Sequence, residues 1–256
     1  MILHIAKREW TETMRHPALL AVCGTLLVLV AGLTVFALFL LDLLTRDPAQ
    51  LQTLAGVLGG DDRATRFLDN ATTATLTAFD FLIFSQYLGF VGVMAGHSLL
   101  HDRQVGTLPF LLLAPVRRHT LLAGKVLGAL GPLTLIYLIV SGIGGLLTLL
   151  LPITADHAEL GPASAGWWVA LLASGPAWAA FVATTCAVVS SLARDVRLAQ
   201  QGVWFVVFFV QLLVAFLITG ALGSVGRQLV ATGLGVLATA LALGVGSAVL
   251  SRDLNR

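Results

Sequence analysis

The sequence predicts an all-α integral membrane protein of six transmembrane helices, with an N-terminal amphipathic interfacial helix and a short cytoplasmic helix between spans two and three. Composition is the first observation: 57% of the 256 residues are hydrophobic and 11% are charged, with a mean hydropathy of +0.93. A soluble domain carries about 25% charged residues. The second observation is that six apolar stretches reach the roughly 20 residues a span needs: about 18–41, 79–100, 126–151, 166–191, 202–222 and 229–250.

The organisation of the chain favours a single domain over residues 1–256, because no internal repeat or low-complexity linker interrupts it. A net charge of +2 is too small to indicate a nucleic-acid partner. Cys23 and Cys186 both fall inside expected spans, so neither a disulfide framework nor a zinc site is expected. Residues 1–16 are too polar, and the first apolar run is too long, for a cleaved signal peptide.

The distribution of basic residues predicts the orientation. If both termini are cytoplasmic, that side holds eleven of the fifteen Lys and Arg residues: Lys7, Arg8, Arg15, Arg103, Arg117, Arg118, Lys125, Arg194, Arg197, Arg252 and Arg256. The outer side holds only Arg46, Arg63, Arg66 and Arg227. The positive-inside rule therefore predicts a multi-pass protein of the inner or plasma membrane with both termini in the cytoplasm.

Residues 1–16 are expected to form a helix that lies in the headgroup plane. Its apolar residues, Leu3, Ala6, Trp10 and Met14, recur every three or four positions, and Lys7, Arg8, Glu12 and Arg15 cover the opposite face. Trp10 is the expected interfacial anchor, and Pro17 allows a turn into the first span. The alternative is a leader that only orients insertion.

The longest polar segment, residues 42–78, is expected to be an outer loop. Asp47-Pro48 and Gly59-Gly60 divide it, and Asp61-Asp62 are suited to cap a helix that continues into the second span. A small outer helical cap and a solvated connector without function are both compatible with this pattern.

Residues 101–125 form a polar segment between the second and third spans. Gly106 permits a break in the backbone, and Thr107 can cap a short apolar helix over Leu108–Ala114. Pro115 ends that helix, and Arg117 and Arg118 follow at the level of the lipid phosphates. Such a helix can insert into a socket on a partner protein, although an ordinary basic loop would also satisfy the charge rule.

This segment resembles the signature of ATP-binding-cassette type-2 permeases. The runs D-R-Q-V-G-T-L, L-L-L-A-P-V-R-R and L-L-A-G-K place ten residues on the family pattern: Asp102, Arg103, Gly106, Thr107, Leu108, Pro115, Val116, Arg118, Gly124 and Lys125. Gln104 and Pro109 depart from it, since the family usually has acidic residues there. The N-terminal K-R-E-W run is similar to the family's amphipathic elbow, with Glu9 and Arg15 at its polar positions.

The resemblance implies the permease half of an exporter, in which two copies of a six-span subunit, or one copy and a close homologue, each couple to a cytosolic P-loop ATPase. The expected coupling residues are Asp102, Arg103, Gly106, Thr107, Leu108, Pro115, Arg117, Arg118 and Lys125, and Glu9, Trp10 and Arg15 form the elbow. The chain lacks a phosphate cradle of its own, because Val126 follows Gly124-Lys125 and His119 replaces the first glycine of a P-loop. ATP and Mg are therefore expected in the partner, and no enzyme activity is expected here.

Other kinds of site have weaker support. His97 and His101 share a helix face, as metal ligands do, but no carboxylate lies beside them within the span, so no metal site is expected. An intramembrane hydrolase has only the Gly96-His97-Ser98 run as a candidate, and those two side chains point to different faces. Spans without a central ionisable residue also argue against an ion-driven carrier.

The cargo best suited to walls of Leu, Val, Ala and Phe is lipid-like, amphipathic or drug-like. Phe205, Phe208, Phe209 and Gln211 on the fifth span either line such a path or face membrane lipid. The alternative function is a non-transport membrane scaffold or sensor that recruits a cytosolic protein through residues 101–125.

Overall fold

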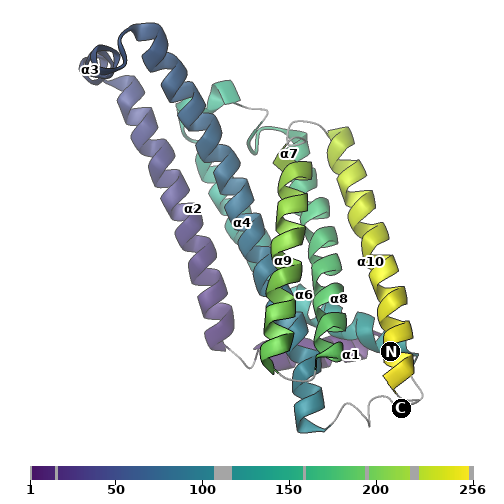
Figure 1. Cartoon of the computed structure of the whole chain (residues 1–256). Coiled ribbons are helices and arrows are strands. Elements are labelled where there is room, and N and C mark those ends of the chain that lie inside the picture. Colours follow the sequence, from purple (N-terminus) through teal and green to yellow (C-terminus); the bar gives the residue numbers. More distant parts are fainter. Residues whose placement is uncertain are drawn as a thin grey trace.

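Long helices that run side by side, with one short helix across one end, make up the computed structural model (Figure 1). It describes residues 2–14, 17–106, 117–157, 160–193, 196–219 and 225–253. The helices are α1 (Ile2–Met14), α2 (Pro17–Arg46), α3 (Pro48–Leu58), α4 (Asp61–Val105), α6 (Arg118–Thr148), α7 (Ala165–Val169), α8 (Gly175–Leu192), α9 (Val196–Thr219) and α10 (Val225–Asp253), with a 3-10 turn η1 (Pro152–His157) and a π-helical turn η2 (Ala170–Ser174). No strand occurs in these ranges, so the all-α prediction is confirmed.

Five helical stretches are long and apolar enough to cross a membrane: Leu20–Arg46, Asp61–Asp102, Arg118–Thr148, Ala165–Leu192 and Val225–Val249. Each coincides with an expected span. The remaining expected span, 202–222, falls on α9, where the apolar stretch within the described part of the chain is the shorter Gln201–Leu213. The sixth span therefore stays a prediction.

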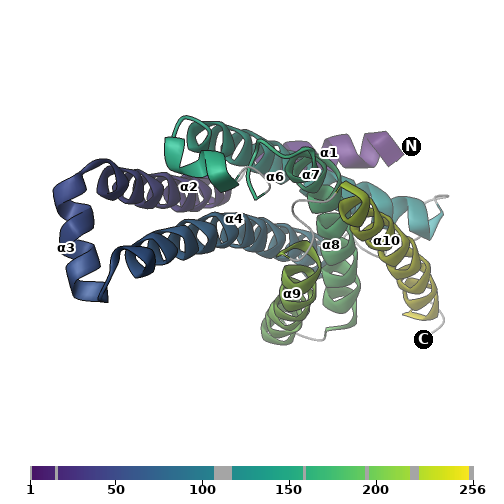
Figure 2. The same ribbon diagram turned by 90° about the horizontal axis from the view of Figure 1, so that it is seen from above.

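The N-terminal helix α1 lies across the end of the bundle and packs against α6 (Figures 1 and 2). Three glycines at helical spacing on α6 form its seat. A Cβ added at Gly124 would lie 2.7 Å from Cβ of Ile5, one at Gly128 would overlap Glu9, and one at Gly131 would overlap the Trp10 ring. This close approach is the reason that α6 carries glycine at these positions.

Residues 42–78, expected as an outer loop with either a small helical cap or a solvated connector, are almost entirely helical. α2 continues to Arg46, the Asp47 carboxylate caps α3 by accepting from the Ala49 amide at 3.0 Å, and Gly59 ends α3 at φ +80°. Asp61 and Asp62 then occupy the first turn of α4, as expected from the sequence. α3 lies across the ends of α2 and α4 (Figure 1).

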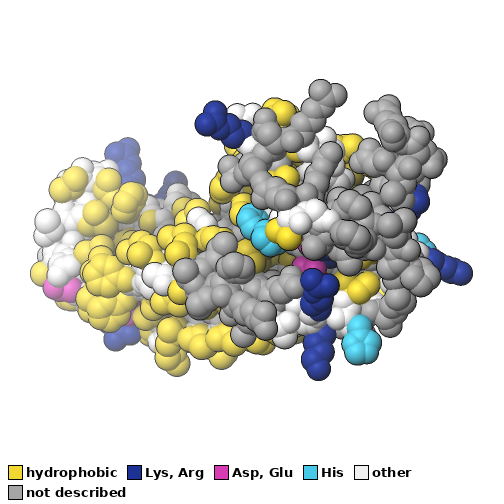
Figure 3. All heavy atoms as spheres, turned by 90° about the horizontal axis from the view of Figure 1, so that it is seen from below, with side chains coloured by type: hydrophobic (Ala, Val, Ile, Leu, Met, Phe, Trp, Pro, Cys, Tyr) yellow, Lys and Arg dark blue, Asp and Glu magenta, His cyan; other side chains and the backbone are white. Residues whose placement is uncertain are grey.

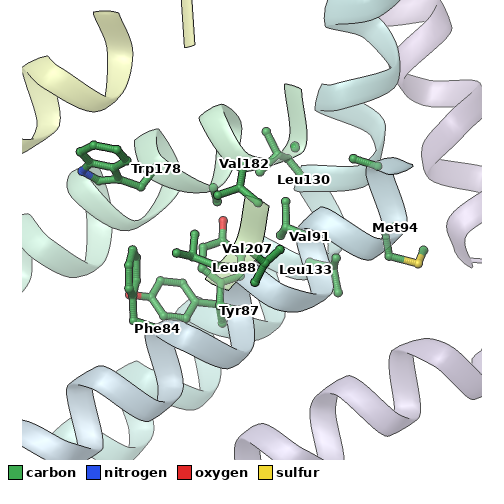
Figure 4. Packing of buried hydrophobic residues seen from close by; sticks show 14 of the residues in the cluster. Phe84, Tyr87, Leu88, Val91, Met94, Leu130, Leu133, Trp178, Val182 and Val207 are labelled. Atoms are coloured by element: carbon green, nitrogen blue, oxygen red, sulfur yellow. The ribbon is translucent and has the colours of Figure 1, made fainter. Parts of the chain in front are cut away.

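The core forms around α4 and α8, which α2, α6, α9 and α10 surround. Tyr87, Leu88, Leu133, Val182 and Val207 are fully buried there (Figure 4). On α4, Gly92 and Gly96 let α8 and α9 come close, since an added Cβ at either would lie 2.8 Å from a valine of α9. Small residues at this Gly-x3-Gly spacing thus permit close helix packing.

The outward faces of α2, α6, α9 and α10 carry many large apolar side chains with more than 40% of their surface exposed. Phe36 on α2 and Phe209 on α9, for instance, are 57% and 52% exposed. Apolar surface on this scale requires a cover of lipid or protein.

The glycine seat of α1 generates a stability prediction. We expect Gly128→Ala to lower the free energy of unfolding by about 1–3 kcal/mol, because the added methyl overpacks the contact with Glu9. Thermal melting in detergent and the rate of proteolytic removal of α1 measure the effect. The matched control is Gly142→Ala on the same helix, where an added Cβ meets no atom within 4 Å. Equal melting temperatures for the two variants would contradict the packing role.

Candidate functional site

A buried cluster of charged side chains lies at the end of the bundle that carries α1. It joins Glu9 of α1, Ser98 and Asp102 of α4, and Lys125 of α6. The exposed fractions of the side chains are 4% for Lys125 and 11% for both Glu9 and Asp102. Residues far apart in the sequence are thus held together by one ammonium group.

The Lys125 ammonium makes two hydrogen bonds and one ion pair in this cluster. Its Nζ donates to Oε1 of Glu9 at 2.7 Å and to Oγ of Ser98 at 3.1 Å, and it lies 2.5 Å from Oδ2 of Asp102. An ammonium has three donors and no acceptor, and three oxygen atoms surround it here. The Ser98 hydroxyl also donates to Oε2 of Glu9 at 2.8 Å, which closes the network.

Because the cluster is buried, it holds its three helices firmly together. Charges removed from water need well-placed partners, and loss of one partner of such a pair is strongly destabilising. The three helices are therefore held at one relative placement, since a shift of any one would break charged hydrogen bonds out of contact with water.

The cluster includes residues from both sides of the segment that links α4 to α6. α4 ends at Val105, and Gly106 follows with φ +76°, a left-handed conformation that confirms the predicted break. On the other side Arg117, with extended backbone (φ −64°, ψ 134°), precedes α6. Asp102 and Lys125 thus stand just before and just after the connecting segment and are in contact with each other.

Several expected coupling residues lie outside the described part of the chain. These are Thr107, Leu108 and Pro115 in the connecting segment and Arg15 after α1, together with the side chain of Arg103. The expected short helix over 108–114 also lies outside the described residues, so it remains a prediction. Arg117 is exposed and Arg118 is half-buried. Lys and Arg side chains project from this face of the molecule (Figure 3).

The residues proposed to line a pathway lie elsewhere, on α9. Phe205, Phe208 and Phe209 form a contiguous aromatic group, with ring centroids 4.5 Å apart for Phe205 and Phe209, and all three face outward. Gln211 points inward and donates from Nε2 to the Ser85 carbonyl of α4 at 2.8 Å. This hydrogen bond between helices explains why a polar side chain stands at position 211 of an apolar helix.

The two histidines of α4 lie beside each other. The rings of His97 and His101 stack with centroids 5.9 Å apart. In the described ranges, no group of three or more His, Cys, Asp or Glu side chains is arranged to hold a metal ion.

Sequence reasoning identified Glu9, Asp102 and Lys125 separately but missed that they meet, and it missed Ser98 as their shared hydroxyl. The spacing of Glu9 was a signal that could have revealed the contact. Glu9 follows Ile2, Ile5 and Ala6 at helical intervals, so it lies on the apolar face of α1 rather than on the charged one. A carboxylate on a packed face needs a buried cation as its partner.

Comparison with known proteins agrees with this architecture. The chain matches the family described as ABC-2 family transporter protein over residues 3–224, and it belongs to that family. It is thus an ABC-2 type permease, a multi-pass membrane protein of a family that is a transport component and not itself catalytic. The family implies association with an ATP-binding subunit. No curated protein sequence matches the chain.

The cluster predicts a specific pattern of stability changes. Lys125→Met should lower the free energy of unfolding by about 3–5 kcal/mol, because Glu9 and Asp102 lose their shared cation while buried. Chemical or thermal unfolding in detergent measures it. Adding Glu9→Gln and Asp102→Asn to that variant should recover most of the loss, because the buried charges are then gone.

The control for this experiment is Lys7→Met on the exposed side of α1, which we expect to change stability by no more than about 0.5 kcal/mol. A triple variant no more stable than Lys125→Met alone would show that the cluster does not act as a buried ionic network.

Proposed function

We propose that this chain is the permease subunit of an ABC exporter, driven by ATP hydrolysis with Mg in a separate cytosolic ATPase that docks on residues 101–125. The observation that supports this most is the buried contact between Lys125 and Asp102 at the two ends of that segment, with Glu9 of α1 bound to the same ammonium. A partner that moves the segment would move three helices together.

The proposed mechanism is rigid-body. When the two ATPase subunits close on nucleotide, they displace the docked segment, and the ionic cluster passes the displacement to α1, α4 and α6 as one unit. α4 packs against α8 and α9, so the movement reaches the aromatic face of α9 through the core. Small residues such as Gly92 and Gly96 provide the close surfaces along which packed helices slide.

The proposed pathway forms between two subunits, either two copies of this chain or this chain and a close homologue. One bundle alone offers a lateral apolar groove of about 530 Å³ between α2 and α6, lined among others by Phe36, Phe39 and Ile143. A groove without charged lining residues suits an acyl chain, which supports a lipid-like or amphipathic cargo. Phe205, Phe208 and Phe209 are proposed to complete the path from the other subunit.

The proposed topology has six spans with both termini in the cytoplasm of an inner or plasma membrane. α1, the ionic cluster and residues 101–125 then lie on the cytoplasmic side, where an ATPase can reach them, and α3 lies outside. The alternative function, a non-transport scaffold or sensor, would use the same docking segment without ATP-driven movement of α4 and α6.

Docking on residues 101–125 predicts a stoichiometric ATPase partner. Affinity purification of this chain in mild detergent should recover a soluble P-loop protein in equal amount, and Arg103→Glu should reduce its recovery by about tenfold or more through charge reversal. The control is Arg66→Glu, an exposed arginine on the opposite side of the proposed topology. Full recovery of the ATPase with Arg103→Glu would place the docking surface elsewhere, whereas a regulator or kinase in its place would favour the scaffold.

A dimeric pathway predicts contacts between subunits. Cysteines introduced at Phe36 and Phe209, in a chain lacking Cys23 and Cys186, should cross-link between two chains, and the yield should change when nucleotide binds the ATPase. Both positions are exposed on a single bundle, so a second subunit is free to cover them. Denaturing electrophoresis and native mass measurement give the result. A monomer by mass with no intermolecular cross-link would exclude this arrangement.

A further inference from the structure

A second polar site lies toward the α3 end of the bundle, far from the ionic cluster. It is a cavity of about 30 Å³ between α4, α6 and α7, whose lining includes Asp80, Ser141 and four aromatic residues: Phe79, Phe84, Tyr137 and Trp167. Neither the sequence motifs nor the proposed coupling mechanism uses it.

Asp80 is the only acidic side chain in this lining. Its Oδ1 accepts a hydrogen bond from Nε1 of Trp167 at 2.8 Å, a neutral donor. Among the residues that the structure describes, no Lys, Arg or His forms an ion pair with it. Asp42 on α2 provides a contrast, because Arg46 lies 2.8 Å from its carboxylate. A carboxylate surrounded by aromatic rings requires a cation or a proton.

Ser141 supplies the second observation. It is 3% exposed, and its hydroxyl has no hydrogen-bond partner in the structure, although it lines the same cavity as Asp80. Buried hydroxyl groups are almost always paired, and a hydroxyl both donates and accepts, so an unpaired one at a cavity points to a polar occupant.

The aromatic walls define the chemistry of that occupant. Rings that surround a carboxylate are the arrangement that recognises organic ammonium groups, because the ring faces attract a cation while the acid pairs with it. At about 30 Å³ the cavity has room for a small polar group such as one ammonium. A hard divalent metal would demand several more oxygen ligands than one carboxylate and a hydroxyl provide.

The depth of the site indicates where the ammonium would come from. Asp80 precedes Ser98 by 18 residues on one continuous helix, which corresponds to about 27 Å, close to the thickness of the hydrocarbon layer of about 30 Å. Trp167 and Trp168 stand at the same end, as aromatic residues do at the level of lipid headgroups. The site is thus positioned at the far membrane interface.

We propose that Asp80, Ser141 and the surrounding aromatic rings bind a primary ammonium group, presented by a lipid headgroup or by a free amine. The ammonium pairs with the Asp80 carboxylate, donates to the free Ser141 hydroxyl and rests against the rings of Tyr137 and Trp167. This proposal goes beyond the transport function and does not depend on it, since the site is complete within one chain.

The test uses the purified full-length chain in detergent and measures thermal stabilisation. Methylammonium chloride should raise the melting temperature of the wild type relative to potassium chloride at equal ionic strength. Asp80→Asn should weaken that binding by about tenfold or more, because a charge-assisted hydrogen bond is lost. Ser141→Ala, which leaves the charge in place, should weaken it by a smaller factor. Asp42→Asn, whose carboxylate already has Arg46, should leave methylammonium binding unchanged.

Nanodiscs distinguish the two sources of the ammonium. Stabilisation of the wild type, but not of Asp80→Asn, by phosphatidylethanolamine over phosphatidylglycerol would assign a lipid headgroup, and a response to methylammonium alone would assign a soluble amine. Equal melting temperatures in methylammonium and potassium chloride would overturn the proposal. So would an infrared carbonyl band of a protonated acid that disappears in Asp80→Asn and persists with methylammonium, because Asp80 would then bind only a proton.

Discussion

The interaction on which the rest of the structure depends is the contact of the Lys125 ammonium with three oxygen acceptors from two other helices. It fixes α1 against α6 and holds the last turns of α4 beside the first turns of α6. Because the group is buried, its geometry cannot be exchanged for water contacts at small cost. The glycines of α6 complement it, since the backbone of α1 could not come close enough for Glu9 to reach Lys125 over larger side chains.

The membrane sets the second constraint. Most of the apolar surface on α2, α9 and α10 faces outward, so packing between helices is concentrated on the narrow faces that glycine and alanine line. Polar groups inside the bundle are accordingly few and paired between helices, as with Tyr87 and Thr134 at 2.6 Å or Ser190 and the Gly96 carbonyl at 2.6 Å. The Ser141 hydroxyl in the cavity beside Asp80 departs from this pattern, because it is buried without a hydrogen-bond partner, as are Trp178 Nε1 and Gln228 Nε2.

Much of the fold follows from hydropathy, because a long apolar run has few alternatives to a membrane helix. The break at Gly106 and the start of α4 at Asp61-Asp62 were also predictable, since left-handed backbone and helix caps have local residue signatures. The helical character of residues 42–60 was less evident, because Asp47-Pro48 and Gly59-Gly60 indicate turns and these two turns flank a helix. The sequence did not predict which residues far apart along the chain come into contact. Glu9, Ser98 and Lys125 are separated by tens of residues, and only the packing of α1 across the bundle brings them together.

The unbroken length of α4 has a consequence of its own. A helix of 45 residues is about 67 Å long, more than twice the thickness of the hydrocarbon layer. In the proposed mechanism this helix would act as a stiff lever: the turns near Asp102 would receive the movement of the ATPase, and the far end carries α3. A tilt of about 5° displaces one end of a rod of this length by about 6 Å, roughly one helical turn. Under that proposal, ATP-driven movement at one face of the membrane would produce movement beyond the other face, on a component of the envelope as readily as on a solute.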